Sequence, residues 1–281
     1  MAMQKQFGKC KLCGIAKELR DSHYLPRRLY AFLRAWQLKN PNPVMSVRGE
    51  LKQIPDQYRG YVFCHDCEDL LNKKGEKWVL ANVPNDYDAA FPLHTAINRL
   101  TPKFAGKHYV LCNASGEAGF EIEQLVYFGI SIFWRGAVHD WKTSTGQPAP
   151  KVDLCGHEDV MREFLLGKCL LTDDIALTLD VWPYKKVLQA LYPVVPNHLP
   201  DCPRYWFYVP GLLYALYLGG NIPKGAARRR ISDGFVAVDQ KAADSVWDYT
   251  KQGLRSQHRG ARIGEMNEAV AKVRPGMSSK K

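Results

Sequence analysis

The chain has 281 residues, of which 46% are hydrophobic and 24% are charged, a composition typical of a folded globular protein rather than a disordered or fibrous one. No run of 18 apolar residues occurs, and the longest apolar stretch, at 206–218, is interrupted by Pro210 and Gly211. Such a pattern excludes a transmembrane helix, so we expect a soluble, cytoplasmic protein with no membrane partner.

The formal net charge of +11 is concentrated at the two ends of the chain. Residues 1–80 carry a net charge of +7, residues 81–223 carry −3, and residues 224–281 carry +7. This distribution indicates two surfaces that contact a polyanion, although basic residues can also serve solubility alone. We expect a zinc-binding module at 1–83, a mixed α/β domain of unassigned role at 84–223, and a basic, partly helical region at 224–281.

Two pairs of cysteines, each separated by two residues, stand near the N-terminus: Cys10, Cys13, Cys64 and Cys67. This spacing lets both thiolates of a pair turn toward one ion, and Gly14 permits the tight turn after the first pair. Together the pairs predict a closed, tetrahedral, structural zinc site. A redox pair would need a thioredoxin-like pattern that the sequence lacks, and eight cysteines are few for a disulfide framework. The cysteines at 112, 155, 169 and 202 are expected to be small core residues.

In chain order, apolar periodicity predicts a short helix over 26–38, followed by an extended hairpin over 44–63. A second helix is expected to begin at Cys67 and to end before Pro84, with Glu68, Asn72 and Glu76 recurring every four residues along one face. That face is also typical of a solvated helix surface.

The segment 121–141 is the strongest helical pattern, and it is apolar on most sides, which indicates a buried helix. Arg135 within it requires a carboxylate or a phosphate as partner. A short amphipathic helix is expected over 158–167, and strands are expected over 175–182, 205–209 and 212–218, with a buried helix as the alternative for 212–218. A further amphipathic stretch covers 242–249. The mixture predicts an α+β fold.

Three short motifs resemble the HNH, or His-Me finger, endonuclease superfamily, and more closely a divergent bacterial branch of it. They are Cys10-x2-Cys13-Gly14, Ser22-His23-x2-Pro26-Arg27 and Cys64-x2-Cys67-Glu68. A later Phe128-x2-Ser131-x2-Trp134-Arg135 is similar to a helix that follows the zinc module in that branch. The close motifs cover residues 10–78, the wider likeness extends to about 141, and residues 142–281 carry no resemblance.

The resemblance implies a treble-clef ββα zinc module followed by a mixed helical and β domain. It implies that His23 is the general base that activates water, a role that suits an imidazole because its pKa lies near physiological pH. Glu68 would bind a catalytic Mg²⁺ or Mn²⁺ ion, with Asn72 and Glu76 available to the same site. The implied activity is that of a metal-dependent endonuclease, and the branch suggests an effector of anti-phage defence.

The sequence also departs from this family. Ser22 stands where the family usually has an acidic metal ligand, with Asp21 one place away, and the asparagine expected before the second cysteine pair is missing at 58–63. A structural role for His23 therefore stays open, as does a catalytically inactive zinc module that binds nucleic acid or protein within a larger complex.

Basic residues near His23 are expected to contact phosphates, since Arg can clamp a phosphate through two parallel hydrogen bonds. They are Arg27, Arg28, Arg34, Lys73, Lys74 and Lys77. The expected partner is nucleic acid, DNA more than RNA, and a protein partner or a homo-oligomer stays open. The basic tail at 251–281 is expected to add affinity without specificity.

Overall fold

The structure is a computed structural model that describes residues 6–35, 44–47, 50–53, 57–84, 90–182, 191–195, 202–239 and 248. At 32–35, 44–47, 50–53 and 191 the description is of the backbone alone. The stretch expected to be amphipathic at 242–249 lies outside these residues apart from Asp248, and so does the basic tail at 251–281. Among the described residues, no helix has the length and apolar character needed to cross a bilayer.

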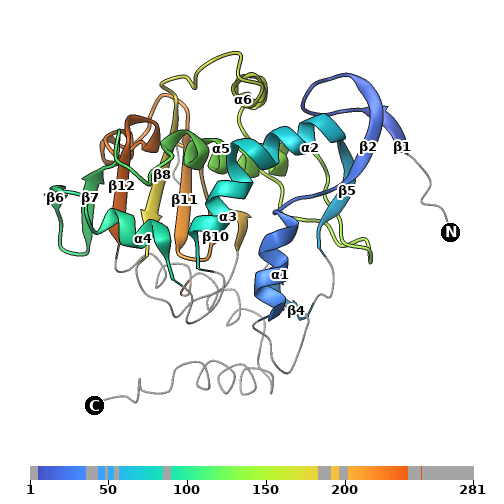
Figure 1. The fold of residues 1–281 in the computed structure, drawn as a ribbon. Helices are drawn as coiled ribbons and strands as arrows, with labels where there is room; N and C mark the ends of the chain where they lie inside the picture. Colours follow the sequence, from blue (N-terminus) through green and yellow to red (C-terminus); the bar gives the residue numbers. More distant parts are fainter. Residues whose placement is uncertain are drawn as a thin grey trace.

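The fold is mixed α+β, with the four-cysteine cluster near the N-terminus (Figure 1). The N-terminal part is built on a three-stranded antiparallel sheet in the order β1-β2-β5. Its elements are β1 (Gln6–Lys9), β2 (Ala16–His23), α1 (Arg27–Ala35), β3 (Val44–Val47), β4 (Glu50–Gln53) and β5 (Arg59–Cys64). The strands β3 and β4 form a separate hairpin, as expected for residues 44–63.

Three helical segments follow β5 without a break. They are α2 (His65–Leu71), the π-helical turn η1 (Asn72–Glu76) and α3 (Lys77–Asn82). The helix begins two residues before the expected start at Cys67 and ends before Pro84, as the sequence predicts. Glu68, Asn72 and Glu76 face one side of this helix as expected, although Asn72 and Glu76 belong to a π-helical turn, which is wider than an α-helical one.

A seven-stranded sheet forms the other half of the molecule, in the order β6-β7-β12-β8-β11-β10-β9. All neighbours are antiparallel except the parallel pair β12–β8. The strands are β6 (Pro102–Ala105), β7 (Tyr109–Asn113), β8 (Ile175–Val181), β9 (Leu191–Val194), β10 (Arg204–Val209), β11 (Leu212–Leu218) and β12 (Phe235–Asp239). The strands predicted at 175–182, 205–209 and 212–218 are confirmed. The boundary expected after residue 223 does not separate this sheet, because β12 follows it and pairs inside the sheet.

The buried helix α5 (Ile122–Val138) joins the two halves (Figure 1). On one side, the ring of Phe128 packs 5.9 Å from Phe207 of β10, and on the other Trp134 stacks 5.9 Å from Phe63 of β5. One hydrophobic core therefore runs from the N-terminal module to the sheet. The remaining helical segments are α4 (Pro92–Ile97), α6 (Glu158–Leu165), α7 (Lys224–Ala227) and η2 (Ile231–Asp233).

The π-helical turn lies unusually close to α5 at Gly75. A Cβ atom added to this buried glycine would lie 3.0 Å from the backbone nitrogen and 3.1 Å from the Cα atom of Phe128. Backbone atoms of a buried helix cannot move aside as the end of a flexible side chain can. Glycine at this position therefore allows η1 and α5 to pack in contact.

Gly75→Ala is expected to lower the stability even though Ala is the better helix former. Helix propensity favours Ala by about 1 kcal/mol, but overpacking of this kind costs about 1–3 kcal/mol. Because the clash is with backbone, we expect a net loss of about 1–2 kcal/mol, which lowers Tm by a few degrees. The control is Gly225→Ala in α7, where no atom lies within 4 Å of the added Cβ. Its Tm should be unchanged or slightly raised, and an unchanged Tm in Gly75→Ala would contradict the packing argument.

Candidate active site and metal centre

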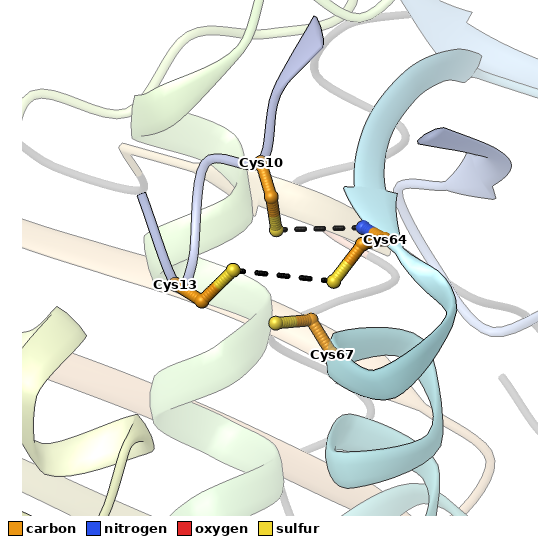
Figure 2. Close-up of side chains that lie close together, drawn as sticks. All are labelled: Cys10, Cys13, Cys64 and Cys67. Carbon is orange, nitrogen blue, oxygen red and sulfur yellow. Dashed lines mark hydrogen bonds between the residues drawn. The ribbon is translucent and has the colours of Figure 1, made fainter. Parts of the chain in front are cut away.

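The structure brings the four cysteines predicted to bind metal into one cluster (Figure 2). Their sulfur atoms all lie within 4.8 Å of one another and point toward a common centre. The Cys13 and Cys64 sulfurs are 4.0 Å apart. A tetrahedral zinc site with Zn–S bonds of about 2.3 Å separates its sulfurs by about 3.8 Å. The cluster therefore has the ligand number, the ligand type and nearly the spacing of a four-thiolate metal centre.

Local backbone geometry positions each cysteine pair. In the first pair, the N–H of Gly14 donates to the carbonyl of Cys10 at 2.9 Å, and Gly14 has φ +76°, as predicted for the tight turn after the pair. In the second pair, Cys64 ends β5 and Cys67 lies in the first turn of α2. The N–H of Cys64 donates to the sulfur of Cys10 at 3.4 Å, which ties the two pairs together.

Hydrogen bonding favours a thiolate at the centre of this cluster. The Cys67 thiol and the backbone N–H of Cys64 both donate to the Cys10 sulfur, and they hold the pKa of the Cys10 thiol well below its ordinary value. The same hydrogen bond raises the pKa of the Cys67 thiol, and burial raises the pKa of the Cys64 thiol. Since a metal-bound cysteine must be deprotonated, a bound cation would have to remove the protons of these two thiols.

A cavity of about 240 Å³ lies beside the metal cluster, at the junction of β2, α1, α2, η1 and α5. It contains all three residues expected to be catalytic, His23, Glu68 and Asn72. The complete lining is His23, Pro26, Arg27, Glu68, Asp69, Asn72, Glu76 and Arg135. The cavity is smaller than most small-molecule sites and suits a phosphate group with a few water molecules.

His23 reaches the cavity from the last position of β2. Burial is the largest effect that lowers the pKa of His23. The positive charges of Arg59, Arg27 and Arg135 lower it further, and Asp21 opposes them. The imidazole is therefore neutral at pH 7, with a ring nitrogen free of a proton and able to accept one.

Arg135 connects the His23 strand to the π-helical turn. It is 2% exposed, and its guanidinium donates to the backbone carbonyls of His23 at 3.4 Å and Tyr24 at 3.3 Å. The same group forms a salt bridge with the carboxylate of Glu76. The carboxylate partner that the sequence requires for Arg135 is thus confirmed, and the pair holds β2 and η1 on opposite sides of the cavity.

Glu68 enters the cavity from α2, one residue after the last cysteine. Burial raises the pKa of this carboxyl, while Arg135 and the Ser22 hydroxyl oppose the rise and Glu76 adds to it. Its Oε1 atom is buried and has no hydrogen-bond partner within the described part of the chain. A buried carboxylate oxygen without a partner, with a second carboxylate nearby, fits a divalent cation well.

The two residues before His23 do not supply that cavity with a carboxylate. Ser22 is 1% exposed, and its hydroxyl accepts the N–H of Phe63 at 3.2 Å, which fastens β2 to β5. Asp21 lies on the surface and pairs with Arg59 at 3.1 Å. Ser22, which stands where the family usually has an acidic metal ligand, therefore has a structural role in this chain: it joins β2 to β5.

The six basic residues expected to bind phosphate are distributed around the cavity unevenly. Arg27 lines it, and Lys73 pairs at 3.2 Å with Asp69, which also lines it. Lys74 instead points away, with its Nζ atom 6.0 Å from the centroid of the Tyr127 ring. Arg28 and Lys77 are exposed. The side chain of Arg34 lies outside the described residues.

Three residues of the cavity were not predicted as site residues: Pro26, Asp69 and Arg135. The motif that ends in Arg135 was the one indication available in the sequence, since a buried Arg requires an acidic partner. The expectation of four further core cysteines is wrong for Cys155, which is exposed and has φ +52°. Cys112 and Cys202 are buried as expected, and Cys169 is half-buried.

We compared the chain with protein-family models, with curated proteins and with solved structures. None of them matches it. The cavity therefore has to be understood from its own residues: a neutral imidazole, a carboxyl group whose buried Oε1 atom has no partner among the described residues, and two guanidinium groups, next to a four-cysteine cluster. This set of groups can bind a phosphate, hold a divalent cation and remove a proton from water.

Proposed function

We propose that the chain is a metal-dependent endonuclease of the HNH type, which hydrolyses phosphodiester bonds in nucleic acid. The observation that supports this proposal is the shared cavity of His23 and Glu68 beside the cysteine cluster. The four thiolates would hold a structural zinc ion within a treble-clef module. Anti-phage defence in a bacterial cytoplasm is the cellular role that the motifs suggest for such an enzyme.

In this proposal each side chain has one task. The neutral imidazole of His23 accepts a proton from the attacking water. Arg27 binds a non-bridging oxygen of the phosphate through its guanidinium group. Arg135 positions His23 through the two backbone carbonyls and forms a salt bridge with Glu76. Glu68 and Asn72 offer oxygen ligands to Mg²⁺ or Mn²⁺, which when bound stabilises the charge that develops on the phosphate.

The direct test is cleavage of plasmid DNA, and of an RNA of comparable length, by the purified full-length protein. We expect strand cleavage when Mg²⁺ or Mn²⁺ is added and none without an added divalent ion, at constant zinc content. Cleavage of DNA and not of RNA, or the reverse, would identify the substrate. An absence of cleavage of either polymer with both ions would contradict the proposal.

The pH dependence of cleavage should report on His23. Since general-base catalysis needs the neutral imidazole, the rate should fall about tenfold per pH unit below the pKa of His23. Burial lowers that pKa below the ordinary value of about 6.5. We therefore expect a constant rate at pH 7 and above, with an acid limb below pH 6.5. His94→Gln is a matched control because His94 is also partly buried but does not line the cavity. An acid limb centred above pH 7 would contradict the assignment of His23.

A second candidate function is supported by the structural role of Ser22. Because Ser22 is buried where an acidic ligand is usual, the module could bind nucleic acid, or a protein partner in a larger complex, without cutting. This function predicts salt-sensitive binding of nucleic acid that is indifferent to Mg²⁺.

A further inference from the structure

Residues 139–151 meet the edge of β5 through a single isolated bridge at Lys142. The N–H of Arg59 in β5 donates to the carbonyl of Lys142 at 3.0 Å, and Lys142 in turn forms a bridge with Pro148. Figure 1 shows this part of the chain beside β5. The segment is far from β5 in the sequence and was not assigned to the nucleic-acid-binding surface by the motifs.

The segment is held rigidly from inside. Trp141 is 1% exposed and stacks on Tyr24 with 5.5 Å between ring centroids. Its Nε1 atom donates to the backbone carbonyl of Arg135 at 2.7 Å, and its own carbonyl accepts the N–H of Ala149 at 2.8 Å. The turn that carries Lys142 is thus fixed by Trp141, which is itself bonded to Arg135, a residue that lines the cavity.

Four cations gather on this surface, and we call them the basic strip: Lys11, Arg59, Lys142 and Lys151. Lys142 bridges Arg59 across the backbone, the N–H of Lys11 donates to Val62 of the same strand, and Lys151 pairs with Asp140 beside His139. Burial lowers the pKa of His139, and the charges of Lys11, Lys151 and Lys142 lower it further against the opposing charge of Asp140. The His139 ring lies against the backbone of Gly60 in β5.

The basic strip is contiguous with the cavity. Arg59 is the register partner of His23 across the β2–β5 pair, and its charge acts on the His23 ring. At the opposite end, the N–H of Lys11 donates to the carbonyl of Val62 in β5 at 3.1 Å. Tyr61, which is 38% exposed, follows Arg59 on the same face of β5.

Two of the four cations are available for a ligand. Arg59 pairs with Asp21 at 3.1 Å, and Lys151 pairs with Asp140 at 2.6 Å. Lys11 and Lys142 are exposed, and neither makes an ion pair with any residue that the structure describes. Asp21 and Asp140 are therefore already paired, and the positive charges of Lys11 and Lys142 have no acidic partner within the part of the chain that the structure describes.

We propose that the basic strip binds the phosphate backbone of a nucleic-acid strand and leads it across β5 into the cavity at His23. The inference deepens the proposed function and rests on it for the place where the backbone is cut. Phosphates are matched by cations at fixed positions, and contacts of this kind position the strand without reading its sequence. Arg27 continues the path on the other side of His23.

The test is the salt dependence of binding by the full-length protein, measured by fluorescence anisotropy without added divalent ions. The probes are a short labelled DNA duplex and an RNA duplex of the same sequence. The double variant Lys11→Gln/Lys142→Gln should reduce the slope of log K against log[salt] by about 2 and weaken binding on the order of tenfold per lost contact near 0.1 M salt. The probe that shows the larger change identifies the polymer.

The matched control removes two lysines at the opposite end of the molecule. Lys103→Gln/Lys107→Gln, in and after β6, causes the same loss of charge on exposed side chains and should leave the slope unchanged (Figure 1). Lys142→Gln alone lies outside the cysteine cluster and should reduce the slope by about 1 at unaltered zinc content. The inference is overturned if the parent binds neither probe, if the strip variants keep its slope, or if the control variants reduce it equally. Because binding is measured without divalent ions, a failure to cleave would not affect these outcomes.

Discussion

Glu68→Ala is expected to abolish cleavage of nucleic acid while zinc content and fold stay intact. A catalytic divalent cation contributes several kcal/mol to stabilising the developing charge, so losing its helix ligand should reduce the rate by about a thousandfold or more. Stability should change little, because burial already disfavours the Glu68 carboxylate and Arg135 keeps its salt bridge with Glu76. The measurements are the cleavage rate, the zinc content and the Mn²⁺ affinity from calorimetry.

Two further substitutions at the same position sharpen this prediction. Glu68→Gln keeps the shape but not the charge, and should be nearly as inactive as Glu68→Ala. Glu68→His introduces another metal ligand and should retain some activity. Asp66→Ala is the control, since Asp66 is an exposed carboxylate on α2 that pairs with Lys17 at 2.8 Å and does not line the cavity. Wild-type cleavage and Mn²⁺ affinity in Glu68→Ala would remove Glu68 from the site.

Cys64→Ser is expected to lose the structural metal and to destabilise the N-terminal module. A structural zinc ion contributes folding free energy directly, and a serine hydroxyl is a poor replacement for a thiolate. Because Cys64 joins β5 to α2, its loss also releases the start of the helix that carries Glu68. We therefore expect the zinc content to fall from one ion per chain toward zero and Tm to drop by more than in any surface variant. Cleavage should be lost because the N-terminal module no longer folds.

Cys155→Ser is the matched control for that variant. Cys155 is exposed and lies outside the cluster, so its substitution should leave the zinc content and the Tm unchanged. Elemental analysis decides the outcome. A purified parent protein without zinc, or a Cys64→Ser variant that keeps a full equivalent of it, would contradict the assignment of the cluster as a zinc site.

The cysteine cluster and the long buried helix could be predicted from the sequence because their determinants are local. A two-residue spacing orients two thiolates whatever surrounds them. Because apolar residues cover most sides of a helix over 121–141, that helix must be buried. A charged residue in a buried helix then requires a partner of opposite charge. The partner of Arg135 is Glu76, which could not be predicted because the two residues are 59 positions apart in the sequence.

The cavity and the sheet order could not be predicted because they depend on contacts between distant segments. The π-helical turn that directs Glu76 toward Arg135 occurs where Gly75 meets the backbone of α5, and no periodicity of 68–78 indicates it. Likewise, β12 inserts between β7 and β8, an arrangement that forms only once the chain has folded back from residue 235. The motifs indicated which residues to examine, and tertiary packing decided which of them meet.

The role of His23 as the base that activates water is decided by the cleavage rate of His23→Ala relative to the parent. Both proteins should be compared with Mg²⁺ or Mn²⁺ at pH 7.5, after their zinc contents and melting temperatures have been shown to agree. We expect the rate of His23→Ala to be lower by about 10²–10⁴-fold, the usual contribution of a general base. A variant that cleaves as fast as the parent would contradict it.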